Sequence, residues 1–235
     1  MNINEGIYDK GIFKAIFLAG GPGSGKSFFK KKFLGNFKSL DADQLGEFKL
    51  KKENIPLDIN KRNTPEEKKM ASKLSRKAWK TTFNKKLPLF LEGRLPIVID
   101  RTGVNYEPIA IQKRTLEDLG YETKMIFVDT PLDIALKRNE TRDRTLSNKL
   151  VKDYHVKVRT NLDNYKLLFG NNNFIAINNS KEGEDPEWNK EWVRINKWFN
   201  TPVNNKKVQE WKKIELSKKA KIVDKKIDDL SKGLK

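Results

Sequence analysis

The sequence contains no cysteine in its 235 residues. Disulfide bonds, thiolate catalysis and cysteine-based metal sites are therefore excluded, and a reducing compartment is favoured. No apolar run approaches the about 20 residues that a membrane span needs. The first residues, MNINEGIYDKG, also lack a basic segment followed by an apolar one. These absences predict a cytoplasmic protein with no membrane partner.

Acidic residues are outnumbered, with 31 Asp and Glu against 49 Lys and Arg, so that the formal net charge is +18. This charge exceeds what solubility requires, and it favours a polyanionic partner such as a nucleic acid. The alternative is a compositional bias towards lysine and asparagine, which segments such as GNNNF and VNNKK suggest. The charge alone therefore identifies no partner, and it does not predict an oligomeric state.

Short apolar runs alternate with longer stretches of helical period, which is typical of an α/β protein with a parallel sheet. The expected strands span residues 13–19, 38–41, 96–100, 124–128 and 173–177. The expected helices span 27–34, 65–86, 108–119 and 147–169, and a further helix begins near Pro131. The predicted fold class is a five-stranded parallel sheet flanked by helices.

A polar segment around Ser180 separates this pattern from a helical remainder, so we expect a core at 1–180 and a helical basic extension at 181–235. Trp188 and Trp192 lie four residues apart and share one helix face. Packing of that face against the core is favoured over base stacking. From Thr201 to the end there are 11 lysines and five acids, which predicts a solvated helix or a nucleic-acid arm.

The strongest motif follows the first predicted strand and precedes a helical pattern, and it consists of Gly20, Gly21, Pro22, Gly23, Ser24, Gly25, Lys26 and Ser27. This segment matches G-x-x-x-x-G-K-[ST] in the required context. Glycines let backbone N–H groups turn inward, and together with the helix N-terminus they form an anion site. We expect the backbone from Gly21 to Gly25 to wrap the phosphates of ATP, Lys26 to bridge the β and γ phosphates, and Ser27 to hold Mg²⁺.

The segment SLDADQLG follows the second predicted strand. Ligands of open α/β sheets bind at the carboxyl ends of the strands, so Asp41 and Asp43 are expected to face the site. Asp43 is the preferred general base for an acceptor hydroxyl, and Asp41 is expected to cap the strand end or to support the metal. The alternative is that both acids only cap the following helix.

Two further segments complete the expected site. The strand LPIVID ends in Asp100, which would hold Mg²⁺ through water or orient Ser27. The segment ALKRNETRDRTL carries Arg138, Arg142 and Arg144, whose guanidinium groups suit the charge of a transferring phosphoryl group. We expect a lid in which Arg138 and Arg142 point the same way and Arg144 follows in a turn. The alternative is a solvated helix face paired with acids.

Three other features carry less weight. His155 is the only histidine, no partner for it is evident from the sequence, and a packing role is favoured over catalysis. The 65–86 segment carries eight basic residues and two glutamates, with Trp79 and Phe83 four apart. This pattern suits either a groove for a single strand or a solvated amphipathic helix. The loop at 178–180 is expected near the adenine pocket because it follows the last strand.

Taken in order, the motifs GGPGSGKS, LDAD, IVIDRTG, LEDLGYETKMIFVDTPLDIALKRN and RDR resemble the kinase fold shared by zeta toxins and phage-type polynucleotide 5′-hydroxyl kinases. The resemblance covers about residues 13–180. It implies that Asp43 activates the acceptor hydroxyl and that the lid arginines are Arg138, Arg142 and Arg144. It also implies a phage-encoded protein in the host cytoplasm.

The sequence departs from these relatives in two ways. It lacks a D-x-D-G-T phosphatase motif, so no end-repair phosphatase activity is implied. Its basic middle helix and tail favour a nucleic-acid hydroxyl over a small acceptor. We therefore expect an ATP-dependent kinase of a nucleic acid 5′ end or modified base. The alternatives are a zeta-toxin-like kinase of a nucleotide sugar or other metabolite, an NTPase stimulated by nucleic acid, and a scaffold protein that retains an NTP site.

Overall fold

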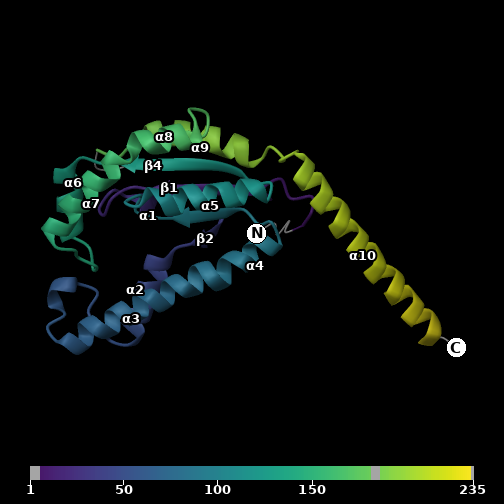
Figure 1. The fold of residues 1–235 in the computed structure, drawn as a ribbon, viewed down its shortest axis with the longest axis horizontal. Coiled ribbons are helices and arrows are strands. Elements are labelled where there is room, and N and C mark those ends of the chain that lie inside the picture. Colours follow the sequence, from purple (N-terminus) through teal and green to yellow (C-terminus); the bar gives the residue numbers. More distant parts are fainter. Residues whose placement is uncertain (1–5, 181–185, 234–235) are drawn as a thin grey trace.

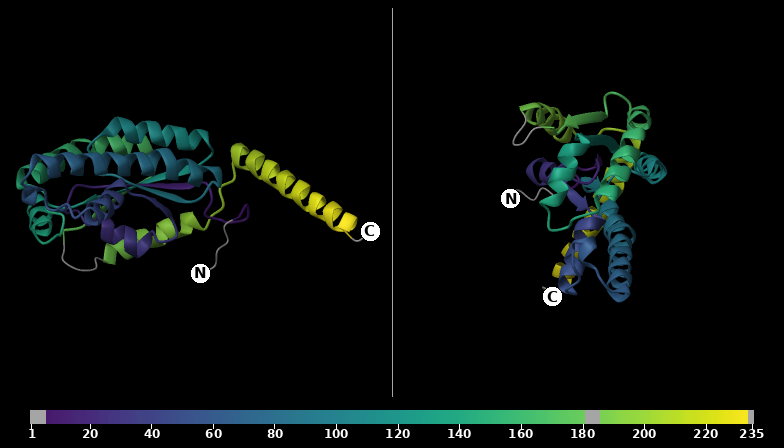
Figure 2. Two further views of the ribbon diagram at one scale, coloured as in Figure 1. Left: turned by 90° about the horizontal axis from the view of Figure 1, so that it is seen from below. Right: turned by 90° about the vertical axis from the view of Figure 1, so that its left-hand side faces the viewer.

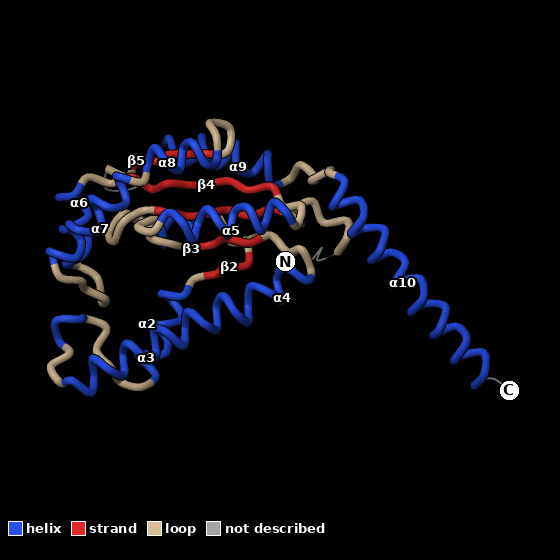
Figure 3. Tube along the Cα trace, viewed as in Figure 1, coloured by secondary structure: helices blue, strands red, loops and turns tan. Residues whose placement is uncertain are grey.

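The computed structural model describes residues 6–180 and 186–233. Five parallel strands form one sheet in the order β2-β3-β1-β4-β5. They are β1 (Lys14–Ala19), β2 (Lys38–Leu40), β3 (Ile97–Asp100), β4 (Glu122–Asp129) and β5 (Phe174–Asn178). The predicted fold class and all five predicted strands are confirmed, with bounds that differ by one or two residues. Figure 3 shows the strands as one layer among the helices.

Helices cover both faces of the sheet. Alternate residues of each strand point to opposite faces, and here both faces carry apolar side chains that need to be buried. On β1, Ala15 and Phe17 belong to the core that includes α5 (Tyr106–Asp118) and α8 (Leu162–Phe169). Ile16 and Leu18 belong to the opposite core, with α1 (Lys26–Phe33) and α9 (Pro186–Phe199). Figure 2 shows the sheet enclosed between these layers.

The helix α9 packs against the sheet through its aromatic face. The Trp188 side chain is 3% exposed, and its ring lies 5.6 Å from the ring of Phe29. The predicted packing of this face against the core is therefore confirmed. The division of the chain after residue 180 stays a prediction, and the contacts of α9 favour grouping it with the core. The polar segment expected there includes 181–185, which lie outside the described residues.

The last helix, α10 (Lys206–Gly233), begins on the body and then runs away from it (Figure 1). Val208 is buried, and the ring of Trp211 meets the ring of Phe13 edge-on at 5.3 Å. Farther along, Ile222 and Ile227 are exposed. Within residues 6–180 and 186–233, no helix has both the length and the apolar character that crossing a membrane requires.

The predicted helix at 65–86 continues farther than expected. It consists of α3 (Pro65–Thr81), the π-helical turn η2 (Thr82–Lys86) and α4 (Leu87–Glu92). A capping box between Thr64 and Glu67 begins α3. Pro88 lacks a backbone N–H and displaces the carbonyl of the preceding turn. The wider π turn accommodates this proline, so the chain stays helical to Glu92.

The predicted helix at 147–169 is two helices, α7 (Asn148–Thr160) and α8, which meet at Asn161. The Asn161 side chain donates to the carbonyl oxygens of Gly103 and Val104 at 3.2 and 2.8 Å. These contacts hold the junction to the loop after β3. Three elements complete the order: α2 (Ala42–Lys52), the helix after Asp41 whose bounds were not predicted, the short η1 (Ile59–Lys61) and α6 (Leu132–Glu140).

Candidate active site

The phosphate-type loop joins the carboxyl end of β1 to α1. Gly25 precedes the first helical residue with φ 92°, a conformation that side chains rarely adopt, and a Cβ there would collide with the amide of Asn179. No acid occupies the first turn of α1. The free N–H groups at this helix start are therefore available to an anion. The loop has the arrangement that the sequence predicts for phosphate binding.

Two side chains, one after β4 and one after β5, hold this loop by hydrogen bonds to the same backbone carbonyl group. The Ser24 carbonyl oxygen accepts from Oγ1 of Thr130 at 3.0 Å and from Nδ2 of Asn179 at 2.6 Å. Arg138 in turn donates to the backbone oxygen of Asn179 at 3.1 Å. Asn179 lies in the loop expected near the adenine pocket, and the structure places its side chain against the phosphate loop.

Replacing Asn179 by alanine is expected to weaken ATP binding about tenfold, because loss of a buried hydrogen bond costs about 1–3 kcal/mol and here releases the loop. Calorimetric titration with ATP measures the effect. The matched control is Asn178→Ala, since the Asn178 side chain is exposed and, among the described residues, its Oδ1 accepts from the backbone N–H of Ser180. Equal ATP affinities for the two variants would contradict the role of Asn179.

Lys26 closes on its own loop. Its Nζ donates to the carbonyl oxygens of Gly20 at 2.5 Å and Gly21 at 3.2 Å. Burial lowers the pKa of Lys26, and the nearby Asp100 and Asp43 partly oppose this effect. Within the described residues, this half-buried ammonium group has two carbonyl partners, so a triphosphate would supply it with stronger, charged acceptors. The position agrees with the predicted contact between Lys26 and the phosphates.

Asp100, at the end of β3, is engaged by a lysine that the sequence analysis missed. Its Oδ2 accepts from Nζ of Lys30 at 2.7 Å, and the same Nζ donates to Oδ2 of Asp41. Lys30 lies four residues after Lys26, so the two lysines share one helix face. This spacing was the only feature of the sequence that could have indicated a role for Lys30 in the site. Asp41 also caps α2, because its Oδ1 accepts from the backbone N–H of Gln44 at 2.8 Å. Asp41 thus caps the following helix, as the alternative interpretation of the sequence expected, and its expected role at the metal stays a prediction.

At the predicted Mg²⁺ site the Ser27 side chain is exposed and could bind the metal. Ser27 lies in the first turn of α1 beside the phosphate loop. Asp100 is 10% exposed and already paired with Lys30, so it suits a contact through water better than direct ligation. One hydroxyl with phosphate oxygens and water is a donor set that Mg²⁺ accepts. The residues therefore fit an ion that arrives with the nucleotide.

Asp43 lies in the first turn of α2 and points away from the core. Its side chain is 69% exposed, and Oδ1 lies 3.3 Å from a guanidinium nitrogen of Arg144. The same guanidinium lies 3.3 Å from Oε1 of Glu47, one turn along α2. Burial lowers the pKa of Arg144, but the two carboxylates outweigh burial and raise it. Arg144 therefore joins the predicted lid to the predicted base.

A hollow of about 320 Å³ lies between α2 and α3, with Asp43 in its wall. We call it the α2–α3 hollow. Glu47, Arg76, Trp79 and Arg144 also line it. The indole of Trp79 is 46% exposed, and its ring lies 5.2 Å from that of Phe83. The hollow thus combines two carboxylates, two cations and an aromatic face.

Arg138 and Arg142 do not share one helix face, contrary to the expectation from their spacing. The helix α6 ends at Glu140, so Arg142 lies in the turn that follows and not one helical turn above Arg138. Arg142 is close enough to Lys26 to lower its pKa. Asn139 explains the early end of the helix: its side chain donates to the Leu146 carbonyl at 2.8 Å and accepts from the Leu146 N–H at 3.1 Å.

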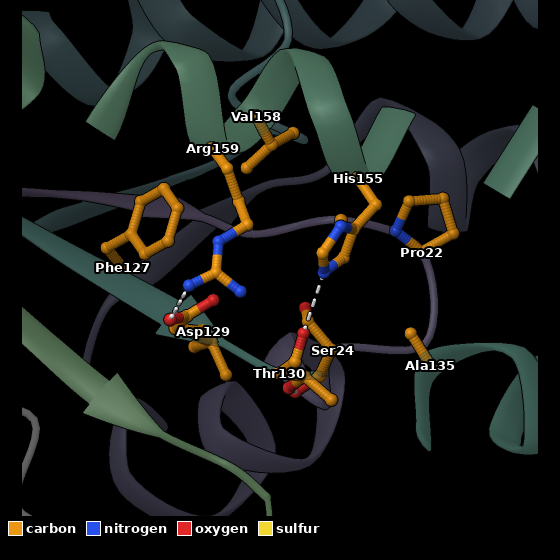
Figure 4. A pocket seen from close by; sticks show the side chains of 11 residues that line it. Pro22, Ser24, Phe127, Asp129, Thr130, Ala135, His155, Val158 and Arg159 are labelled. Carbon is orange, nitrogen blue, oxygen red and sulfur yellow. Dashed lines mark hydrogen bonds and ion pairs between the residues drawn. The ribbon is translucent and has the colours of Figure 1, made fainter. Parts of the chain in front are cut away.

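His155 lies beside the phosphate loop with a partner that the sequence did not reveal. Its Nε2 lies 3.0 Å from the Thr130 carbonyl oxygen, so this nitrogen donates (Figure 4). On the same helix, Arg159 pairs with Asp129 at 3.2 Å. The cavity among these residues measures about 10 Å³, which is room for about one water molecule. His155 therefore packs against the loop, as expected.

Comparisons with solved structures agree on the fold. A kinase structure from Chloroflexus aurantiacus superposes with a TM-score of 0.54 at 12% identity, covering 77% of this chain and 97% of that chain. The AvrRxo1-ORF1:AvrRxo1-ORF2 complex with sulphate ions matches with a TM-score of 0.57 at 12% identity, covering 86% and 70%. The same complex with ATP gives 0.54 at 13% identity with the same coverage. At these identities the likeness establishes the α/β P-loop kinase fold alone.

The family comparison goes further. A search of curated proteins found no match. The family model described as zeta toxin matches residues 9–179, which include the phosphate loop, Asp43 and the lid arginines. This match spans more than half of the chain. The chain therefore belongs to the zeta toxin family, as an ATP-binding P-loop kinase that transfers a phosphoryl group to an alcohol.

Proposed function

We propose that the acceptor is a hydroxyl group of a small phosphorylated metabolite, of the nucleotide-sugar class that zeta toxins use, and that it binds in the α2–α3 hollow. The observation that carries the proposal is the hollow itself, which has about 320 Å³ of space and Asp43 in its wall. This volume is at the lower end for small-molecule sites. Arg76 supplies charge for a phosphate, and Trp79 supplies an apolar face.

In the proposed mechanism, ATP binds with its phosphates on the loop and on Lys26. Asp43 accepts the proton of the acceptor hydroxyl as its oxygen attacks the γ-phosphorus, and the bond to the β-phosphate oxygen breaks. Arg138 and Arg142 would stabilise the charge on the transferring group, with Arg144 moving from Asp43 to join them. When bound, Mg²⁺ would be held by Ser27 and would offset the negative charge of the phosphates.

The test is an acceptor survey with ATP labelled at the γ-phosphate. Separate pools contain nucleotide sugars, nucleosides and oligonucleotides with free 5′ hydroxyls. We expect the label in a phosphomonoester of the nucleotide-sugar pool. Label that stays in inorganic phosphate in every pool, and whose release nucleic acid accelerates, would instead identify an NTPase without an acceptor.

A nucleic-acid hydroxyl remains the second candidate because of one observation. The exposed face of α3 carries basic residues next to the half-exposed Trp79, and α10 adds a further basic helix. Backbone phosphates and bases bind surfaces of this composition. Label in the oligonucleotide pool would favour this candidate. The cytoplasmic location and the phage origin expected from the sequence stay predictions.

Trp79→Ala is expected to raise the acceptor KM about tenfold and to leave the ATP KM unchanged. The reason is that stacking of a base on an aromatic side chain is worth about 1–3 kcal/mol. Trp79→Phe should restore most of the affinity, since it keeps a ring. Phe48→Ala is the control, because Phe48 is exposed on α2 outside the hollow. An unchanged acceptor KM in Trp79→Ala would place the acceptor elsewhere.

A further inference from the structure

Lys30 contacts two carboxylates that come from two different strands. Its Nζ donates to Oδ2 of Asp41 and, at 2.7 Å, to Oδ2 of Asp100. The side chains are largely shielded from water, with exposed fractions of 13% for Lys30, 11% for Asp41 and 10% for Asp100. Three charges therefore share one nearly buried site next to the phosphate loop.

The sheet register brings the two carboxylates together. Leu40 of β2 pairs with Ile99 of β3, so the residues that follow, Asp41 and Asp100, lie side by side. Neighbouring strands are about 4.8 Å apart, and two carboxylates at that spacing repel each other. Burial raises the pKa of Asp100. A cation between the two groups is needed to keep both charged.

Lys30 supplies that cation. Burial lowers its pKa, but Asp100 and Asp41 outweigh burial and raise it, so the side chain stays an ammonium ion. A divalent ion would use the same two carboxylates. Because the lysine belongs to the chain, the position is filled whether or not nucleotide is bound.

The contact also joins two functional helices. Lys30 lies one turn after Lys26 on α1, which begins at the phosphate loop. Asp41 is the N-cap of α2, and Asp43 lies in the first turn of α2. The helix that begins at the phosphate loop is therefore connected to the helix of the proposed base by the Lys30 side chain and the Asp41 cap.

We propose that Lys30 is a fixed internal cation, whose ammonium group fills the place that a divalent ion would otherwise take between Asp41 and Asp100. In this position it fixes the start of α2 relative to the phosphate loop. Any benefit of this positioning for catalysis rests on the proposed function of Asp43. The ionic contacts of Lys30 are independent of that function. Lys30 is thus a positioning residue, and the site needs only the metal ion that accompanies the nucleotide.

The test uses the full chain without nucleotide and needs no acceptor. Lys30→Met removes the cation that contacts both carboxylates and leaves the more distant Lys26 nearby. It is expected to lower the Tm by about 10 °C. Mn²⁺ serves as the probe ion: at millimolar concentration it should recover several degrees in K30M, because it can bind between the carboxylates. The wild type should shift by less than about 1 °C. Lys31→Met is the control, since Lys31 is exposed on the same helix.

A second variant separates the ion site from general stability. K30M/D41N/D100N removes all three charges, so it should be more stable than K30M and should not respond to Mn²⁺. If K30M does not fold at all, the triple variant should still fold. Failure of both to fold would overturn the proposal, as would a K30M protein with wild-type Tm or with a Tm that Mn²⁺ leaves unchanged.

Hydrogen exchange tests the link to α2. The amide of Gln44 donates to Asp41, so its exchange should be faster in K30M and should slow again when Mn²⁺ is added. The amides of α5 should not change. Unchanged exchange at Gln44 would show that Lys30 does not hold α2. Neither result depends on kinase activity, so the proposed function and this inference can fail separately.

Discussion

Asp43→Asn is expected to reduce phosphoryl transfer at least about 100-fold while ATP still binds, because a general base contributes about 10²–10⁴ to the rate. The amide of asparagine has nearly the shape of the carboxylate but cannot accept the hydroxyl proton. Asp43 is 69% exposed in the wall of the α2–α3 hollow, so the substitution leaves no buried group without a partner. The measurement is the transfer rate at saturating ATP, together with the ATP affinity by calorimetry.

Glu47→Gln provides a matched control for this prediction. Glu47 lies one turn along the same helix and contacts the same guanidinium of Arg144 at 3.3 Å. Its substitution removes the same charge without removing the proposed base, so transfer should fall less than about fivefold. Equal losses in the two variants would show that Asp43 acts only by holding Arg144. Full activity of Asp43→Asn would exclude it as the base.

Lys26→Met is expected to lower kcat/KM for ATP about 100-fold or more. In P-loop enzymes the lysine cradles the β and γ phosphates, and removal of one preorganised donor costs about 10²–10³ in rate. Here the ammonium group is held at the loop by the carbonyl oxygens of Gly20 and Gly21. Methionine keeps the length of the side chain and removes its charge. The rate of ADP formation at several ATP concentrations measures the loss.

The control for Lys26 is Lys31→Met, which removes a positive charge from the exposed side of α1. It should leave kcat/KM within about twofold. A comparable loss in both variants would attribute the effect to the overall charge of the helix. A Lys26→Met enzyme with wild-type kcat/KM would contradict phosphate binding by this loop.

The parts of the site that depend on local sequence were predictable. The phosphate loop needs glycines, a lysine and a serine in one continuous segment, and its flanking strand and helix are encoded beside it. The capping role of Asp41 is also local, since an acid before a helix accepts from the N–H groups of its first turn. The five strands followed from apolar runs bounded by turn residues.

The remaining features depend on contacts between distant segments. Lys30 finds its partners only because β2 and β3 pair in a register that sets Asp41 beside Asp100. The end of α6 at Glu140 depends on the side chain of Asn139, which binds the backbone of Leu146. No periodicity in the sequence reports such contacts, so Arg138 and Arg142 were expected on one helix face that the structure does not form. The lid itself stays a prediction.

The middle of the chain shows the same limit. The basic residues and Trp79 in α3 suited either a groove for a single strand or a solvated amphipathic helix, and nothing in the sequence indicated that α2 packs against them. Once α2 packs on α3, the two helices enclose the α2–α3 hollow, and Asp43 reaches it. The composition of α3 alone therefore did not reveal the hollow, which depends on the pairing of the two helices.

The most direct measurement is a crystal structure with Mg²⁺ and a non-hydrolysable ATP analogue. We predict that the triphosphate lies on the loop from Gly20 to Gly25, that Lys26 leaves its carbonyl partners for the phosphates, and that the γ-phosphate faces the hollow that contains Asp43. A triphosphate bound elsewhere, or a γ-phosphate separated from Asp43 by the body of the sheet, would contradict the account.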